Sequence, residues 1–303
     1  RLPQGSRLGG EPQVSVPSDD AGASDRAFAL LQDLLPQHFL SRTMHGLARS
    51  ETRWVRNAIL RFVLRAYPQI DLGEAANPDP FSYPSFNAFF TRALKAGARP
   101  LAGDERDLVS PVDGTLSQLG IVRDGQLLQA KGMHYTAGAL LADEAAAARY
   151  DGGGFACIYL APYNYHRIHM PCDGRLRQMV HVPGTLFSVN PTTARGVPGL
   201  FARNERVVCQ FEGEHGPFVV VMVGAMLVSS VSSVWDGLEI PPYANAISSR
   251  DLRARGIHLA RGAEMARFNM GSTVILLLPP GGPRLDTLAP EQPVRMGQRI
   301  GSA

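Results

Sequence analysis

The sequence has few cysteines and no long apolar run. Its three cysteines, Cys157, Cys172 and Cys209, are widely spaced along 303 residues. An odd, scattered set argues against a disulfide framework, and buried reduced thiols are expected. A membrane-spanning helix needs about 18 or more consecutive apolar residues, and no such stretch occurs. Because the sequence begins at Arg1 and not at Met, it leaves the true N-terminus open.

The sequence also lacks a strong charge of either sign. Lys and Arg total 30 against 27 Asp and Glu, which leaves a formal net charge of +3. This bias is too weak to indicate a nucleic-acid partner, and none is expected. With 45% hydrophobic and 19% charged residues, the composition predicts a globular protein with a large core. The 31 glycines and 23 prolines predict many turns.

Three regions differ in pattern. Residues 1–25 are rich in Gly, Ser, Pro and Asp without periodicity, which predicts a disordered segment. Residues 26–107 begin with helical patterns and end in a linker. Residues 108–303 contain short strands broken by turns. The predicted fold class is α+β, with N-terminal helices followed by a mostly antiparallel β body with hairpins and partial internal duplication.

The helical segment of residues 26–68 has two interpretations. In "RWVRNAILRFVLRAYP" one side gathers Val55, Ile59, Phe62, Val63 and Ala66, while four arginines and three further large apolar residues lie around the rest. Such a helix either packs on several sides inside a bundle or lies in a membrane interface with its arginines near lipid phosphates. The pattern alone favours neither.

Aspartate–glycine pairs mark the turns of the β region. They occur at Asp113-Gly114, Asp124-Gly125, Asp173-Gly174 and Asp236-Gly237, and each is a hairpin signal. Two of them belong to an internal echo, "SPVDGTL" at 110–116 and "MPCDGRL" at 170–176. Such an echo is typical of similar turns in a partly duplicated β fold.

A Gly-Ser pair stands at the mouth of a predicted buried strand. The apolar and β-branched run that begins at Thr273 ends at Pro279, and Gly271-Ser272 comes directly before it. The plain interpretation is a turn before a strand. The chemical interpretation is a serine hydroxyl that attacks a carbonyl once a base takes its proton.

Two histidines and an aspartate could serve such a serine. His166 and His169 would face opposite sides of a strand, so they could do different jobs. Asp113, His169 and Ser272 would form an orienting group, a base and a nucleophile, although the sequence does not establish that they meet. The alternatives are structural histidines, or a zinc site using His166, His169 and Cys172, which Pro171 and the lack of a fourth ligand weaken.

Six segments, taken in order, resemble one known family. They are "FNAFFTRALKAGARPL", "SPVDGTLSQLG", "YLAPYNYHRIHMPCDG", "VPGTLFSVNP", "LFARNERVVCQF" and "GAEMARFNMGSTVILL", spread over residues 80–300. Together they resemble the pyruvoyl-dependent phosphatidylserine decarboxylases. Two positions depart from the family pattern, which usually has Leu at Met270 and Gly at Ala266. Met conserves the volume of Leu, and Ala266 asks whether that backbone needs a positive φ.

The resemblance implies a self-processing enzyme. Ser272 would attack the carbonyl of Gly271, with His169 as the base and Asp113 as its orienting group. The chain would be cleaved between Gly271 and Ser272, and Ser272 would become a covalent pyruvoyl cofactor. That ketone would form a Schiff base with phosphatidylserine and accept the electron pair as carbon dioxide leaves, giving phosphatidylethanolamine. His166 is expected to contact the substrate carboxylate and transfer a proton, and no metal ligand is expected.

The resemblance also implies where the enzyme works and with what. Its partner would be phosphatidylserine in an anionic membrane, and the protein would be a homodimer whose protomers each hold a large and a small chain. It would lie peripherally on the cytoplasmic face of a bacterial inner membrane, with a mitochondrial inner membrane as the alternative. Two other functions stay open: a zinc-dependent hydrolase that uses His166 and His169, and a non-enzymatic β module.

Overall fold

The computed structural model describes residues 37–130, 132–225, 230–238, 245–269 and 272–303. The helices are α2 (Gln37–Arg49), α3 (Arg53–Ala66), α4 (Phe86–Phe90), α5 (Ala137–Leu141), α6 (Glu144–Ala147), α7 (Pro191–Gly196) and α8 (Leu200–Arg203), with 3-10 turns η1 (Pro80–Ser82), η2 (Ala148–Tyr150) and η3 (Arg253–Arg255). The predicted disordered segment, residues 1–25, lies outside the described residues.

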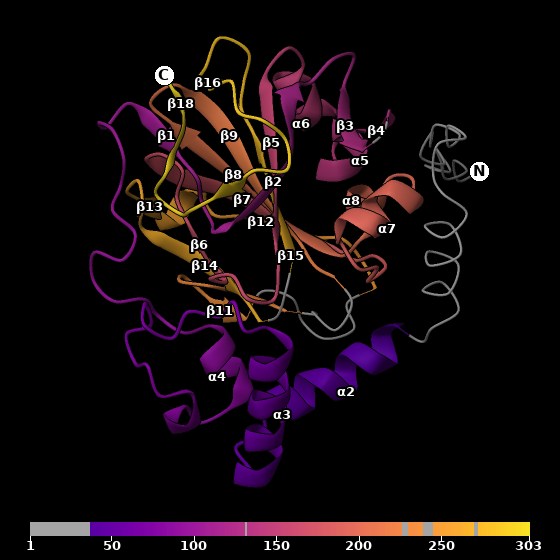
Figure 1. Ribbon diagram of the computed structural model, residues 1–303. Coiled ribbons are helices and arrows are strands. Elements are labelled where there is room, and N and C mark those ends of the chain that lie inside the picture. Colours follow the sequence, from indigo (N-terminus) through magenta and orange to yellow (C-terminus); the bar gives the residue numbers. More distant parts are fainter. Residues whose placement is uncertain (1–36, 131, 226–229, 239–244, 270–271) are drawn as a thin grey trace, which may run out of the picture.

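A large antiparallel sheet forms the centre of the molecule (Figure 1). Its order is β12 (Ser248–Asp251), β7 (Gly174–Val182), β8 (Arg206–Gly213), β9 (Gly216–Val223), β15 (Ser272–Leu277), β5 (Gly154–Leu160), β2 (Gly114–Ile121) and β17 (Pro293–Val294), with β13 (His258–Leu259) also on β7. The predicted α+β class, with helices first and mostly antiparallel strands after them, is confirmed.

Smaller sheets complete the β body. One has the order β11 (Gly237–Leu238), β10 (Val231–Ser233), β14 (Glu264–Phe268) and β6 (Arg167–His169). Another has β1 (Asp107–Val109), β18 (Arg299–Ser302) and β16 (Arg284–Leu285), and a hairpin joins β3 (Gln126–Ala130) to β4 (Met133–Thr136).

The central sheet is covered on both faces because its middle strands carry apolar residues on both sides. In β15 every residue is buried, as the apolar run predicted. Ile275 and Leu277 face one core, which helices α5 to α8 cover, whereas Val274 and Leu276 face the other, which the smaller sheets cover. A strand buried on both faces holds its first residue in a fixed position.

The four Asp-Gly pairs play two structural roles. Asp124-Gly125 and Asp236-Gly237 make the predicted hairpin turns between β2 and β3 and between β10 and β11. The two echo segments do not turn a hairpin, because Gly114 and Gly174 instead open strands β2 and β7.

Each echo segment accepts a backbone hydrogen bond from the residue that directly precedes the other one. The amide of Val109 donates to the carbonyl of Pro171 at 3.0 Å, and the amide of His169 donates to the carbonyl of Pro111 at 2.8 Å. The duplication therefore places the segment that carries Asp113 beside the strand that carries His169.

Helices α2, α3 and α4 form a layer below one edge of the central sheet (Figure 1). The buried side of α3 overlaps only in part with the apolar side that the sequence predicted, from which Ile59 and Val63 pack against the helical core. Arg56 and Leu60 are buried, because the Arg56 side chain caps the carbonyl of Tyr83 at 2.9 Å and Leu60 packs in a core with the phenylalanines of α4. Phe62, placed on the apolar side by its spacing, is 70% exposed.

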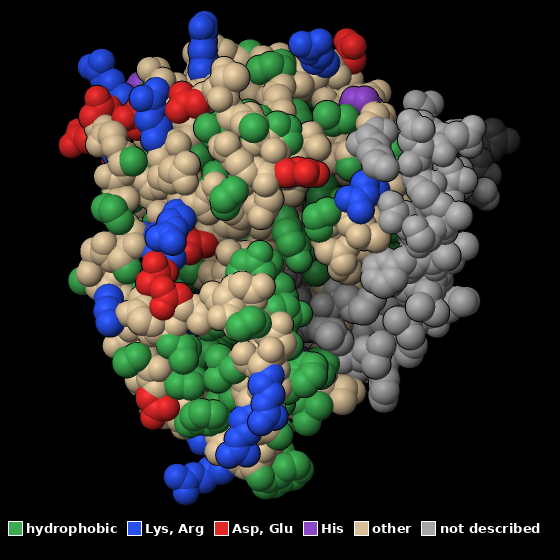
Figure 2. Space-filling model, in the orientation of Figure 1, with side chains coloured by type: hydrophobic (Ala, Val, Ile, Leu, Met, Phe, Trp, Pro, Cys, Tyr) green, Lys and Arg blue, Asp and Glu red, His purple; other side chains and the backbone are tan. Residues whose placement is uncertain are grey.

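The outer face of α3 is therefore both apolar and basic. Trp54 is 75% exposed, and Phe62, about two turns further along the helix, is also exposed. Arg61 and Arg65 are exposed on the same stretch of the helix. Figure 2 shows hydrophobic and basic side chains together at this lower end of the molecule. The structure thus combines both interpretations of the segment, a packed inner side and an exposed side suited to an interface.

Candidate active site

Ser272 begins the central strand of the large sheet. It pairs with Leu160 of β5, and the next residue, Thr273, pairs with Tyr159 on one side and Val223 on the other. The Ser272 side chain is buried, and its Oγ has no hydrogen-bond partner among the described residues. A buried hydroxyl without a partner is unusual, and it is available for a reaction. Gly271 lies outside the described residues.

Asp113 lies at the same end of the sheet's strands as Ser272. Thr115 pairs with Tyr159, so Gly114 is level with Leu160 and hence with Ser272. A Cβ at Gly114 would lie 2.4 Å from the carbonyl oxygen of Tyr159. Only glycine lets β2 approach β5 this closely, and that approach fixes the position of Asp113 directly before the strand.

His166 lies in the loop that leaves β5 and is fully buried. Its ring stacks on Phe90 of α4, with centroids 4.0 Å apart and planes at 24°. Its carbonyl accepts the amide of Phe268, four residues before Ser272. Burial lowers the pKa of His166 to about 3, and the positive charge of Arg92 adds to that effect. The imidazole is therefore neutral at physiological pH.

His169 has both ring nitrogens engaged. Nδ1 lies 2.8 Å from the carbonyl oxygen of Gly262, so this nitrogen carries the proton and donates. Nε2 lies 3.1 Å from the hydroxyl of Tyr165. Burial raises the pKa of Tyr165 to about 12, so the phenol keeps its proton and donates to Nε2. Burial also lowers the pKa of His169. The ring is a neutral base with its lone pair on Nε2.

Asp113 is bound by an arginine. Its carboxylate accepts two bonds from Arg99 Nε and one from Arg99 Nη2, at 2.6–3.1 Å, and a fourth from the amide of Met296 at 2.8 Å. The described residues show no hydrogen bond between Asp113 and His169, or between His169 and Ser272. The carbonyl of Gly262 occupies the orienting place that the triad gave to Asp113. The catalytic roles of Asp113, His166, His169 and Ser272 stay predictions.

A polar cluster fixes the chain just before the predicted cleavage site. The side-chain amide of Asn269 donates to Ser230 Oγ at 2.9 Å and to Ser232 Oγ at 3.0 Å. Its oxygen accepts from Asn87 of α4 at 3.2 Å. Ala266, where the family usually has glycine, lies within strand β14 and has no positive φ, so an L side chain suits that position.

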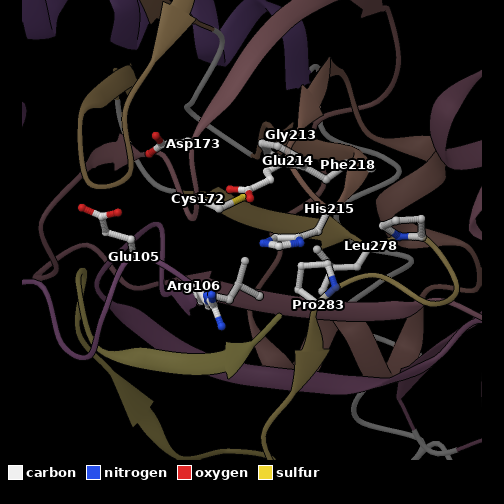
Figure 3. Close-up of a pocket in the computed structure, with 13 residues that line it drawn as sticks. Glu105, Arg106, Cys172, Asp173, Gly213, Glu214, His215, Phe218, Leu278 and Pro283 are labelled. Atoms are coloured by element: carbon white, nitrogen blue, oxygen red, sulfur yellow. The ribbon is translucent and has the colours of Figure 1, made fainter.

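Two cavities flank the β body at opposite ends. One of about 180 Å³ lies on the Ser272 side and is lined by Asp113, Gly114, Tyr165 and Arg92 among others. The other, of about 80 Å³, is lined by Cys172, His215 and Leu278 among others (Figure 3). Leu278 is six residues after Ser272 along a strand, about 20 Å away. The cavity of Figure 3 is therefore separate from the candidate site.

The zinc interpretation finds no ligand set in the described part of the chain. No group of three or more His, Cys, Asp or Glu side chains comes together there as metal ligands. His169 uses both nitrogens on protein groups, and His166 stacks on Phe90. Nothing in this arrangement favours a hydrolase that uses these two histidines.

Sequence reasoning missed several residues of this site. A backbone carbonyl such as that of Gly262 carries no signal in the sequence. Tyr165 and Arg99 stood inside recognised segments, yet their partners are 4 and 14 positions away and depend on the fold. One signal was available for Tyr165 and Arg99. Charged and phenolic side chains are rarely buried, so their presence within segments expected to be buried could have marked them as site residues.

The comparisons with known proteins identify a family. The family model described as phosphatidylserine decarboxylase matches residues 86–302, and a model described as PSD matches residues 27–68. The phosphatidylserine decarboxylase proenzyme of Xanthomonas euvesicatoria pv. vesicatoria (strain 85-10) is 54% identical over 268 residues, 88% of this chain and 95% of that protein. The proenzyme of Azoarcus sp. (strain BH72) is 51% identical over 280 residues, 92% of this chain and 96% of that protein. The chain belongs to the phosphatidylserine decarboxylase family.

Proposed function

We propose that this protein is a self-processing decarboxylase that converts phosphatidylserine to phosphatidylethanolamine. The observation that carries the proposal is Ser272: a buried serine with an unpartnered hydroxyl, at the mouth of the central strand, in a chain 54% identical to a phosphatidylserine decarboxylase proenzyme. A hydroxyl that a fold buries without a partner needs another explanation than stability.

Self-cleavage occurs between Gly271 and Ser272. The Oγ of Ser272 attacks the carbonyl carbon of Gly271 and its proton passes to a base, so the amide becomes an ester. Loss of the Ser272 α-proton then breaks the ester and releases residues 1–271 with a new carboxylate. The dehydrated residue takes up water and loses ammonia, which leaves a pyruvoyl group at the start of the small chain.

His169 is the base in this step. Its proton is fixed on Nδ1 by the carbonyl of Gly262, so Nε2 has the free electron pair that a base requires. The hydroxyl of Tyr165 donates a hydrogen bond to that electron pair. When Ser272 reacts, this hydroxyl must either move away from Nε2 or relay the proton to it. Asp113 supports the arrangement through Arg99 and through the adjacent backbone bond from His169 to Pro111.

The site fits a pyruvoyl group at position 272. The position is buried, it lies at the end of a rigid strand, and no described side chain competes for the oxygen. The group supplies a ketone that condenses with the substrate amine and accepts the electron pair when carbon dioxide leaves. The neutral His166 contacts the substrate carboxylate and moves the proton that replaces it. A neutral, apolar environment favours this reaction because the carboxylate loses its charge.

The enzyme acts at an anionic membrane surface, the cytoplasmic face of a bacterial inner membrane. Residues 26–107 attach it there, and residues 108–303 carry out the chemistry. The support is the outer face of α3, where Trp54 and Phe62 are exposed beside basic side chains. No helix among the described residues has the length and apolar character needed to cross a bilayer. Two cleaved protomers form a homodimer, which light scattering of the purified protein tests.

The native protein and three variants test the assignment. Intact-mass measurement of the native protein should show residues 272–303 as a separate chain that begins with a carbonyl group. Ser272→Ala should remain one chain without activity, and His169→Ala should cleave slowly or not at all. His166→Ala should cleave yet release carbon dioxide poorly. A native protein that turns over phosphatidylserine as a single chain would overturn the proposal, and a cleaved His166→Ala enzyme with native turnover would remove that histidine from the mechanism.

A further inference from the structure

Arg92 is a buried cation without an anionic partner among the described residues. The residue is 4% exposed, and its Nε is buried without a hydrogen bond. No carboxylate among the described residues lies within ion-pair distance of its guanidinium. Its guanidinium carbon lies 5.2 Å from the centroid of the Phe89 ring, a cation–π contact that carries no negative charge. A buried guanidinium normally has a carboxylate or several carbonyl oxygens around it. Arg92 therefore lacks the partner that its burial requires.

The other buried arginine side chains in the described part of the chain have partners. Arg56 donates to the side-chain oxygen of Asn57 and to the carbonyl of Tyr83. Arg99 binds Asp113 and Glu74, both at under 3 Å. Arg206 donates to four backbone carbonyls. The same fold thus supplies partners to buried guanidinium groups wherever they hold structure together. The contrast indicates that Arg92 is kept for a ligand.

Arg92 lines the cavity of about 180 Å³ beside the candidate active site. The cavity also contains Asp113, Gly114, which is level with Ser272, and Tyr165, which holds His169. The charge of Arg92 is close enough to His166 to affect that imidazole. A ligand bound at Arg92 would therefore lie next to the groups that carry out the chemistry.

The other charges facing this cavity are already engaged. Asp113 and Glu74 are bound by Arg99, and Glu74 also meets Arg295 at 3.4 Å. Asp71 accepts the amide of Gly73 at 2.7 Å. Arg295 also lines the cavity, but its side chain is 69% exposed to solvent and it pairs with Glu74. Among the described groups that line the cavity, Arg92 is the buried cation with no carboxylate within ion-pair distance. The space is sufficient for a phosphate and the atoms attached to it.

We propose that Arg92 binds the phosphodiester of the phosphatidylserine head group. This inference rests on the proposed function and names the residue that holds the lipid phosphate. The head group carries two anions, and the chemistry decides between them. Decarboxylation removes negative charge from the carboxylate, so a cation paired with it would stabilise the substrate and slow the reaction. The phosphodiester keeps its charge throughout, and a cation on it contributes binding without that penalty.

Two substrates separate this role from a structural one. The enzyme is assayed with dihexanoyl phosphatidylserine and with O-octyl-L-serine, which has the amine and carboxylate but no phosphate. Arg92→Gln should still cleave itself, as a denaturing gel shows, and should lose about 10- to 100-fold in kcat/KM on the phospholipid, the range expected of a charged hydrogen-bonded contact. Its kcat/KM on O-octyl-L-serine should stay within about twofold of native. Arg92→Lys should lose less, since it keeps the charge without the fork of donors.

A phosphate probe gives a second readout on the native enzyme. Sn-glycerol 3-phosphate has no amine to react with the pyruvoyl group, so it should inhibit only through its phosphate. Competitive inhibition that weakens at least tenfold in Arg92→Gln supports the site. If the enzyme does not turn over O-octyl-L-serine, this inhibition measurement alone tests the inference. If Arg92→Gln folds poorly, Arg92→Lys replaces it in the same measurement. The control is Arg253→Gln, an exposed arginine paired with Asp251 on the surface, which should change nothing.

The contrary results are distinct from failure of the proposed function. Equal losses on both substrates, or native inhibition by glycerol phosphate in Arg92→Gln, would overturn the inference. Two results together would show a site for free phosphate and would also overturn the inference. Inorganic phosphate would inhibit as well as glycerol phosphate, and Arg92→Gln would turn over the phospholipid at the native rate. An uncleaved or inactive native protein would instead contradict the proposed function.

Discussion

Burial sets the charge of the residues around Ser272. His166 and His169 are both buried, and desolvation lowers the pKa of each. In the unfolded chain both would have a pKa near 6.5. Below that pH the unfolded state binds protons that the folded state does not, so stability falls as pH falls. These two histidines therefore make the folded enzyme sensitive to mild acid.

The histidine effect is measurable as a slope. In the uncleaved Ser272→Ala background, the free energy of unfolding should fall between pH 6.5 and pH 5 by up to about 1.4 kcal/mol per pH unit for each neutral buried histidine. Adding His166→Asn should flatten the slope by about that amount, because Asn does not titrate. Urea unfolding at pH 7.5, 6.0 and 5.0 gives the slopes. The same slope with and without His166 would contradict its assignment as a buried neutral group.

Asp113 should act together with Arg99. Their side chains are 8% and 6% exposed and joined at 2.6 Å, and removing one partner of a buried pair leaves an uncompensated charge. Asp113→Asn and Arg99→Gln should each slow self-cleavage, about 10-fold or more, and the double variant should be little worse than either. Arg295→Gln, an exposed arginine that also meets Glu74, is the control. Multiplicative losses in a timed gel assay would show that the two residues act separately.

At the scale of residues, the sequence could predict which side chains are able to react, but not which groups they contact. Ser272, His166, His169 and Asp113 were chosen because their side chains can react, and their roles stay predictions. The family prediction, which rested on six segments in order, is confirmed. The contacts of His169 could not be predicted, since one is a backbone carbonyl 93 positions away. The pairing of Asp113 with Arg99 likewise depends on how β2 and its neighbours align.

At the scale of elements, local patterns predicted the strands better than the helix faces. β15 is a short apolar run, and its burial on both sides follows from composition alone. In α3 the buried side holds Arg56, because a carbonyl of the neighbouring turn satisfies its charge, and Phe62 is exposed instead. Spacing cannot predict a buried arginine, since that depends on an acceptor 27 positions away.

The contact of β2 with β5 should depend on glycine at position 114. A Cβ there would lie 2.4 Å from the carbonyl oxygen of Tyr159, so Gly114→Ala must move one strand. We expect a loss of about 1–3 kcal/mol in stability and slower self-cleavage, because Asp113 moves with the strand.

Gly46→Ala is the matched control for this substitution. Gly46 lies in helix α2 with no atom within 4 Å of an added Cβ, so alanine should leave stability equal or slightly higher. The midpoints of urea unfolding compare the two variants. Equal midpoints for Gly114→Ala and Gly46→Ala would show that the strands can adjust.

At the scale of the whole molecule, the helical layer and the active site are joined. Phe90 of α4 stacks on His166, and Asn87 binds Asn269, two residues before the predicted cleavage site. The side chain of Arg167 donates to the carbonyl of Thr91 at 2.9 Å. Removing the helical layer would therefore disturb the site as well as any membrane contact. A test of membrane binding must change only its outer surface.

Trp54→Ser combined with Phe62→Ser makes that change. Both side chains are largely exposed, at 75% and 70%, so the fold and self-cleavage should be native. Each large apolar side chain that enters the interface contributes on the order of 1.5–3 kcal/mol, and binding to vesicles of mixed phosphatidylserine and phosphatidylcholine should fall at least 10-fold in a sedimentation assay.

The control for this pair is Val234→Ser with Ile247→Ser, two exposed apolar residues of the β body. These side chains are 46% and 59% exposed and lie outside α3, so vesicle binding should stay native. If both double variants bind vesicles equally well, α3 does not attach the protein to membranes. If both lose binding equally, the contact is a general apolar one and not a property of this helix. Only a loss of binding confined to the Trp54 and Phe62 variant places the membrane that carries the substrate against the helical layer, whose Phe90 stacks on His166.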